Sequence, residues 1–142
     1  MIYKTELQVT ESLVKFLIGE GYQVRTEVSN MGQSIDVIAI YGDEMVTAIE
    51  VKPLLGGWKR GVAQCKAHEL VADYIALAIG TTHGCSALSV AIRRKGYGLL
   101  LLDEGNGKWR WVELPRRNWR IFQAQRKRFL ENLNTVPEEV AA

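Results

Sequence analysis

Two acidic residues and a lysine stand in otherwise apolar segments of this 142-residue chain, and their types suit hydrolytic chemistry. Asp36 lies in Ile35-Asp-Val-Ile-Ala-Ile40, whereas Glu50 and Lys52 belong to Ala48-Ile-Glu-Val-Lys52. Residues two apart in a strand share a face, so we expect Glu50 and Lys52 side by side, about 6–7 Å apart at the backbone. A lone Glu-x-Lys is more simply an ion pair on a strand, so the position of Asp36 decides between the two interpretations.

The loop between these two segments determines whether Asp36 and Glu50 meet. If the loop is the three residues Gly42-Asp43-Glu44, Tyr41 pairs with Met45 and Asp36 falls opposite Glu50. Directly opposed side chains have Cβ atoms about 4.5–5.5 Å apart, so both carboxylates could hold one cation. A two-residue loop would shift the register by one and send the two acids to opposite faces of the sheet.

Two carboxylates this close in a half-buried place repel each other unless a proton or a cation neutralises them. Oxygen ligands suit Mg²⁺, with Mn²⁺ as a substitute, and these ions also accept the oxygens of a substrate phosphate. The ion lowers the pKa of an attacking water, while the Lys52 ammonium could orient that water and stabilise charge on the phosphate. The pattern therefore predicts a phosphodiesterase with Asp36, Glu50 and Lys52 as catalytic residues and no organic cofactor.

The rest of the sequence predicts one α/β domain over residues 1–133 and a loose tail over 134–142. Its order is αβββαβ, a mixed central sheet flanked by helices, followed by a β-hairpin and a basic helix that begins after Pro115. Residues 29–34 are expected to form a loop. The expected elements are a helix at 5–20, strands at 22–28, 35–41 and 45–51, a helix at 58–71, a strand at 73–79, a helix at 83–95, strands at 97–103 and 108–114, and a helix to 133.

Composition and charge exclude several classes of protein. The longest apolar runs, residues 75–79 and 99–102, are far shorter than the roughly 20 residues of a membrane helix, and the first residues lack the apolar stretch of a signal peptide. We therefore expect a cytoplasmic protein without a membrane partner. Cys65 and Cys85 lack metal-binding spacing and are predicted to be reduced thiols. A net charge of +2 does not itself imply nucleic acid, but the basic clusters at 59–66, 93–95 and 116–128 could follow a phosphate backbone or face solvent.

The spacing of Asp36, thirteen further residues and then Glu50-Val51-Lys52 resembles the PD-(D/E)XK nuclease superfamily. Within it, the layout of residues 5–80 is most similar to archaeal-type Holliday-junction resolvases, although Ile35 stands where the family has proline. The resemblance implies a restriction-endonuclease-like core. It also implies a metal ion held by Asp36, Glu50 and the backbone carbonyl of Val51.

The resemblance extends to accessory residues in two helices. Resolvase-like members carry a glutamate on the first helix at the position of Thr10. Glu6 lies one turn earlier on the same apolar face, whereas Glu11 is rotated by about 100° to its margin, so Glu6 is the favoured candidate. Gln64 is similar to a glutamine that many relatives present to the site, and His68 follows one turn later as a weaker candidate. Glu6 and Gln64 are therefore predicted as catalytic accessories.

Four residues are predicted to contact DNA. Ser34 lies just before Asp36 and could contact substrate or only shape the turn. Trp58, Lys59 and Arg60 follow the catalytic strand after two glycines, so they could border the cleft and contact phosphates. The alternative is that they form a solvent-facing helix start.

The leading prediction is a magnesium-dependent DNA endonuclease that acts on duplex or branched DNA. A homodimer is expected, because a compact domain with one site cuts one strand and these substrates require two cuts. Junction resolution, restriction-like cleavage, repair and homing all reuse such a core and remain open. The alternative from another class is a non-catalytic nucleic-acid-binding module on the same fold.

Overall fold

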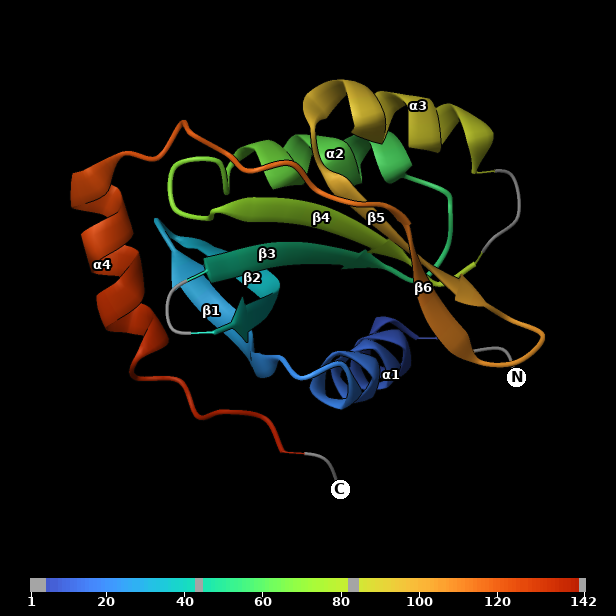
Figure 1. Ribbon diagram of the computed structural model, residues 1–142, viewed down its shortest axis with the longest axis horizontal. Helices are drawn as coiled ribbons and strands as arrows, with labels where there is room; N and C mark the ends of the chain where they lie inside the picture. Colours follow the sequence, from blue (N-terminus) through green and yellow to red (C-terminus); the bar gives the residue numbers. More distant parts are fainter. Residues whose placement is uncertain (1–4, 43–44, 82–84, 141–142) are drawn as a thin grey trace.

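The computed structural model describes residues 5–42, 45–81 and 85–140, and in this part of the chain four helices surround one six-stranded sheet (Figure 1). The predicted mixed α/β fold and the predicted order of elements are confirmed. The expected helix start at residue 83 lies outside the described residues. The elements are α1 (Glu6–Gly19), β1 (Gln23–Asn30), β2 (Gln33–Tyr41), β3 (Met45–Lys52), α2 (Trp58–Lys66), β4 (Tyr74–Ile79), α3 (Ser86–Lys95), β5 (Gly98–Asp103), β6 (Lys108–Glu113) and α4 (Gln123–Leu133).

The six strands lie side by side in sequence order. β3, β4 and β5 are parallel to one another, whereas β1–β2, β2–β3 and β5–β6 are antiparallel pairs. The two parallel connections run through α2 and α3, which cover the same face of the sheet, and α1 covers the other face (Figure 1). β4 is therefore covered on both sides, which explains why it is almost wholly apolar and buried.

Alternate residues of the central strands enter two separate cores. Leu13 and Leu17 of α1 pack with Val37 and Ile49 on one face. On the other face Ile38, Leu77 and residues of α2, α3 and α4 form the second core. Each fully buried Leu or Ile contributes about 1.5–3 kcal/mol relative to an exposed one, so the two cores hold β2 and β3 firmly between the helical layers.

Helix α1 begins and ends at residues suited to those positions. Thr5 Oγ1 accepts a hydrogen bond from the Gln8 backbone N–H, and the Gln8 side chain accepts one from the Thr5 N–H, which makes a capping box. After the helix, Gly21 adopts a φ of +95°, a conformation that L side chains rarely take. These two ends fix how α1 lies against the sheet.

The register of the β2–β3 hairpin is the one predicted from a three-residue loop. Tyr41 pairs with Met45, and the pairing continues to Val37 and Ile49. The loop residues 43 and 44 lie outside the described part of the chain. One further step of this register brings Asp36 opposite Glu50.

The predicted loop at residues 29–34 is wrong, because β1 and β2 continue through most of it. β1 runs to Asn30 and β2 starts at Gln33, so only Met31 and Gly32 form the turn. Both have positive φ, 50° and 77°, which matches the two-residue turn whose twist suits a β-hairpin. The strands therefore extend further beyond Asp36 than expected.

The predicted last helix is wrong in its first half, because α4 begins only at Gln123 and residues 115–122 are extended. The Asn118 side-chain amide donates to the carbonyls of Glu69 and Ala72, and its backbone N–H donates to the Asp73 carbonyl at 2.7 Å. α2 also ends earlier than predicted, at Lys66, and turns follow it to Val71. The long-range hydrogen bonds of Asn118 therefore outweigh the local helix-start signal at Pro115.

Residues 136–139 lie along the free edge of β1, whereas the sequence predicts a loose tail there. The Glu139 N–H donates to the Val24 carbonyl at 2.7 Å, and Arg25 Nε donates to the Val136 carbonyl at 3.0 Å. Thr26 Oγ1 also donates to Glu139 Oε1 at 2.9 Å. The segment thus covers part of the edge strand, whose unpaired backbone groups would otherwise be exposed.

Two expectations from composition can be compared with the structure. No helix within the described ranges is both long and apolar enough to cross a membrane. Cys65 and Cys85 are reduced, buried thiols. Burial raises the pKa of Cys65, whose Sγ lies 3.6 Å from the Ala76 carbonyl oxygen, so this residue behaves as part of the core.

Candidate active site

Asp36, Glu50 and Lys52 come together where β2 and β3 stop pairing. Asp36 Oδ2 accepts a hydrogen bond of 2.8 Å from the Val51 backbone N–H, which takes the place of a ladder bond. The carboxyl groups of Asp36 and Glu50 lie close enough that each shifts the pKa of the other. Lys52 follows Glu50 by two residues on the same strand and therefore shares its face.

The backbone of Val51 lies beside the two carboxyl groups. The N–H and C=O of one strand residue point toward the same neighbouring strand, so the Val51 carbonyl lies on the edge where Asp36 meets β3. The next carbonyl, that of Lys52, points the other way and accepts from the Gly80 N–H at 2.9 Å. This alternation places the Val51 carbonyl on the side of the strand that faces Asp36.

Glu50 is held from the side of α2 by His68, a residue to which the sequence gives only a weak signal. Glu50 and His68 are 4% and 1% exposed, and His68 Nε2 lies 2.5 Å from Glu50 Oε1. Burial lowers the pKa of His68 to about 4, so near pH 7 the ring is neutral and its Nε2–H donates to the ionised Glu50. One carboxylate oxygen of Glu50 is thus fixed by the protein.

The pKa values of the two acids reflect their crowding. Burial, followed by the hydrogen bond with Glu50, raises the pKa of Asp36 to about 7. Burial also raises the pKa of Glu50. Near neutral pH the pair therefore tends to keep one proton between its two carboxyl groups, and this is the position in which a cation would replace the proton.

The available donor set fits a hydrated, oxygen-preferring ion. Among the residues that the structure describes, no group of three or more His, Cys, Asp or Glu side chains is placed to hold a metal. The donors are instead the carboxylates of Asp36 and Glu50 with the Val51 carbonyl. Mg²⁺ is commonly held by one or two carboxylates while it keeps waters or phosphate oxygens as its other ligands. Zinc, which prefers nitrogen and sulfur ligands, does not suit this set.

Glu27 is a member of the site that the sequence analysis missed. The β1–β2 register places it opposite Asp36, and it has a φ of 54°, unusual for a residue with a side chain. Its charge contributes to the raised pKa values of Asp36 and Glu50. The signal that could have found it is the two-residue turn at Met31-Gly32, since that turn sets the register.

Ser34, predicted to contact DNA, is bonded to Glu27. Its hydroxyl donates to Glu27 Oε2 at 2.8 Å, and the residue is exposed at the start of β2. The structure therefore places Ser34 at the rim of the site, where it orients an acidic side chain.

A hollow of about 770 Å³ opens beside Asp36, between α1, β1 and the segment after α4. Partial burial and then the charge of Asp36 raise the pKa of Glu6, and the Lys52 ammonium opposes this shift. Glu6 therefore lies within electrostatic reach of the central residues. A phosphate backbone would be repelled here unless a cation neutralised the acids, which are Glu6, Glu11, Glu27, Asp36 and Glu139.

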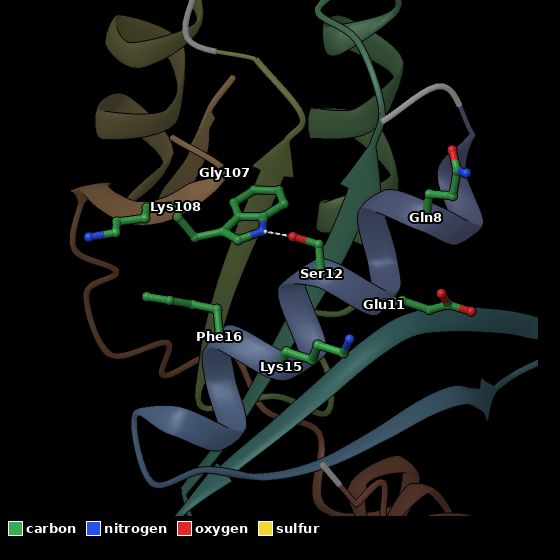
Figure 2. Close-up of a pocket in the computed structure, with 8 residues that line it drawn as sticks. Gln8, Glu11, Ser12, Lys15, Phe16, Gly107 and Lys108 are labelled. Atoms are coloured by element: carbon green, nitrogen blue, oxygen red, sulfur yellow. Dashed lines mark hydrogen bonds between the residues drawn. The ribbon is translucent and has the colours of Figure 1, made fainter. Parts of the chain in front are cut away.

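A second hollow, of about 630 Å³, lies on the other flank of α1, between the helix and the β5–β6 hairpin (Figure 2). Trp109 Nε1 donates to Ser12 Oγ at 2.9 Å there and ties the hairpin to α1. Glu11 lines both hollows, so it sits between them, whereas Glu6 lines only the hollow that contains Asp36. Of the two acids considered on the first helix, Glu6 is the one coupled to Asp36.

Helix α2 contacts Lys52 through a residue without a side chain. A Cβ added to Gly61 would lie 3.5 Å from Lys52 Cε, so the lysine stem runs directly over this glycine. Gln64, one turn further along α2, is partly buried, and within the described part of the chain its Oε1 has no hydrogen-bond partner. Gln64 thus lies on the helix that flanks Lys52, and its buried side-chain oxygen makes no hydrogen bond within the described residues.

Of the predicted DNA contacts at the start of α2, Lys59 and Arg60 face solvent, whereas Trp58 is partly buried and packs against the core. Lys59 and Arg60 are exposed, and Lys59 Nζ lies 5.7 Å from the centre of the Trp58 ring, in a cation–π arrangement. These residues begin the helix that follows the Lys52 strand. They remain free to meet a phosphate backbone next to the site.

Comparisons with known proteins identify solved structures with a similar fold. No family model and no curated protein matches the chain. The solved structure of SPO1766, a protein of unknown function from Silicibacter pomeroyi, matches with a TM-score of 0.69 and 15% identity over 95% of this chain and 87% of that chain. An XisH family protein from Nostoc punctiforme matches with a TM-score of 0.55 and 16% identity, over 74% of this chain and 98% of that chain.

A third solved structure aligns with this chain over the same fractions as the Nostoc punctiforme protein does. It is an fdxN element excision controlling factor protein from Anabaena variabilis, with a TM-score of 0.56 and 17% identity over 74% of this chain and 98% of that chain. At these identities the likeness concerns the fold alone. The chain shares with these proteins a mixed α/β fold in which helices flank a central sheet.

Proposed function

We propose that the chain is a metal-dependent DNA endonuclease of the PD-(D/E)XK superfamily, with a restriction-endonuclease-like core. One observation carries the proposal: the carboxyl groups of Asp36 and Glu50 lie close enough beside the Val51 backbone to shift each other's pKa, with Lys52 on the same face. A structural ion pair would account for Glu50 and Lys52 alone. It would not account for a second, partly buried carboxyl group next to them, because crowding like charges costs stability.

Each residue has a defined task in this proposal. Asp36, Glu50 and the Val51 carbonyl would hold Mg²⁺ or Mn²⁺, which when bound supplies charge neutralisation and an acidified water. The Lys52 ammonium is placed to orient the attacking water and to stabilise negative charge on the phosphate. Glu6 borders the same hollow, where its carboxylate can accept hydrogen bonds from water, and Gln64 can contact the water or a phosphate oxygen.

The substrate that we propose is duplex or branched DNA, cut by a homodimer with one site in each subunit. Exposed Lys59 and Arg60, with the partly buried Trp58 beside them, lie next to the Lys52 strand and support contact with a phosphate backbone. A Holliday-junction resolvase-like activity is our first choice, and restriction-like, repair or homing cleavage are alternatives on the same core.

A second candidate function comes from the fold comparison. The Anabaena variabilis protein is named as an excision controlling factor, and a factor of that kind could bind DNA without cutting it. The observation that favours this candidate is the shared fold. The adjacent carboxyl groups of Asp36 and Glu50 argue against a non-catalytic binding factor, because two crowded acids would repel the phosphates of DNA.

The test is cleavage of a four-way junction, a flap, a duplex and a single strand, each with Mg²⁺ or Ca²⁺, by the parent and by Glu50→Gln. We expect Mg²⁺-dependent cleavage by the parent and at least a hundredfold loss in Glu50→Gln, with Glu11→Gln as an active control. Preference for the junction would select the resolvase-like activity. If the parent cuts nothing and binds DNA equally well with or without metal and with or without Glu50, the non-catalytic candidate replaces the nuclease.

A further inference from the structure

The extended segment at residues 115–122 is fixed to the protein by its backbone. Arg116 N–H donates to the Gly96 carbonyl at 2.9 Å, and Phe122 N–H donates to the Leu70 carbonyl at 3.0 Å. Between these points Asn118 is bonded through both its backbone and its side chain to the loop that precedes β4. The segment is therefore a rigid strap, and its other side chains have defined positions.

The side chains that this strap presents outward are aromatic and basic. Trp119 is 78% exposed, which is unusual for so large an apolar ring on a fixed segment. The Arg117 guanidinium lies over this ring, 4.6 Å from its centre. A hollow of about 320 Å³ lies beside the ring, and its basic lining residues are Lys95, Arg116, Arg117 and Arg120.

The acidic groups nearby are fewer than the basic ones. Glu69 lines the same hollow and lies 3.5 Å from Arg120, while Asp73 is buried and pairs with Arg117 at 3.7 Å. The Arg120 side chain is 76% exposed and keeps most of its donors toward solvent. The surface is therefore positively charged around an exposed aromatic ring.

We propose that Trp119 with Lys95, Arg116, Arg117 and Arg120 forms a platform that binds single-stranded nucleic acid, with a base stacked on the Trp119 ring and phosphates on the basic side chains. Every base has a π-face and every linkage a negative charge, so this pairing of ring and cations suits a single strand of any sequence. An acidic protein would use the charges but would leave the ring without a planar partner. Duplex DNA keeps its bases stacked inside the helix and cannot use the ring either.

The platform is separate from the acidic site. The strap is bonded to Asp73, which in turn bonds to Val46 near the start of β3, whereas Lys52 ends the same strand. At about 3.3 Å per strand residue, six residues place the two regions roughly 20 Å apart. Figure 1 shows the strap passing on the side of α2 and α3, away from α1. The proposed platform therefore does not depend on DNA cleavage, and either this proposal or the proposed endonuclease activity can be contradicted without the other.

The experiment measures binding of a fluorescein-labelled single-stranded dT20 oligonucleotide by anisotropy, in EDTA so that no strand is cut. We expect Trp119→Ala to weaken binding by about 5- to 100-fold, the effect of losing one stacked base. Trp119→Phe should stay within about threefold of the parent, because phenylalanine keeps a stacking face. Arg120→Ala should reduce the slope of log K against log salt by about 0.7.

A matched pair of lysines separates the platform from general charge. Lys95 and Lys15 are both exposed helix residues, on α3 and on α1 across the sheet. Lys95→Ala should weaken binding severalfold, and Lys15→Ala should not. Equal binding by Trp119→Ala and the parent, or equal effects of the two lysine variants, would overturn the platform. Circular dichroism shows whether Trp119→Ala is folded. If it is unfolded, Trp119→Phe still tests the platform, because binding outside about threefold of the parent would contradict it.

Discussion

His68 Nε2 lies 2.5 Å from Glu50 Oε1, and both side chains are almost completely buried. The contact joins the turn after α2 to the strand that carries Glu50 and Lys52. Because burial keeps His68 neutral near pH 7, the contact is a hydrogen bond to the carboxylate and adds no positive charge to the site. The ring therefore orients Glu50 without weakening its attraction for a cation.

Replacement of His68 should lower metal affinity without abolishing the fold. We expect His68→Ala to weaken Mg²⁺ binding about 10- to 100-fold, the usual effect of losing a residue that orients a metal ligand. His68→Gln should recover a good part of the loss, because its side-chain amide can donate to Glu50 from a similar distance. Isothermal titration with Mn²⁺ measures both. Equal affinities for the parent and His68→Ala would show that the imidazole only fills space.

The raised pKa of Asp36 should cost the metal-free protein stability as pH rises. Asp36 has a pKa of about 7 in the folded chain, above its unfolded value, so the unfolded state ionises first. The lowered pKa of His68 has the opposite effect over the same range, so the contribution of Asp36 is isolated by comparison with Asp36→Asn. Relative to Asp36→Asn, the free energy of unfolding of the parent should fall between pH 4 and pH 8 by about 2–4 kcal/mol, the lower figure allowing for solvent screening. Urea unfolding of both proteins in EDTA at pH 4 and pH 8 tests this, and a difference between them that does not change with pH would contradict it.

Lys52 should be needed for turnover and dispensable for metal binding. Its ammonium acts on water and phosphate, so Lys52→Ala should bind Mn²⁺ as well as the parent does, or slightly better because one positive charge is gone. Cleavage by the variant should fall at least a hundredfold. Loss of metal binding in Lys52→Ala would show that the lysine holds the two carboxylates in place and would remove it from the chemistry.

Gly80 should tolerate no side chain, because it lies against the loop that follows Lys52. A Cβ at this position would meet the Pro53 carbonyl oxygen at 2.4 Å, so the backbone would have to move. We expect Gly80→Ala to cost about 1–3 kcal/mol of stability. Gly19→Ala is the matched control, because its Cβ would meet nothing within 4 Å and alanine favours a helix. Equal unfolding midpoints for the two variants would contradict this packing.

The central trio could be predicted because its placement depends on local information. Strand periodicity puts Glu50 and Lys52 on one face, and a three-residue loop sets the register that brings Asp36 to Glu50. Glu27 could be reached by the same reasoning only if Met31 and Gly32 are read as a two-residue turn. Methionine rarely adopts a positive φ, so the residue types at positions 31 and 32 do not predict that turn.

The remaining features depend on contacts between distant segments. His68 contacts Glu50 because α2 ends at Lys66, two residues before His68. The helical pattern of the sequence continues to residue 71, so the sequence alone does not indicate this helix end. Residues 115–122 carry a helix start signal, Pro115, yet Asn118 holds them extended against the loop before β4. Such bonds join residues more than forty positions apart, and no local pattern records them.

The most direct test of the account is Mg²⁺-dependent cleavage by the parent compared with Asp36→Asn. The variant keeps an oxygen that can accept from the Val51 N–H and should be at least as stable as the parent, so lost activity could not be ascribed to unfolding. We predict that the parent cuts DNA with Mg²⁺ and not in EDTA, and that Asp36→Asn cuts at least a hundredfold more slowly. Equal cleavage by the two proteins would contradict a metal site at Asp36 and Glu50.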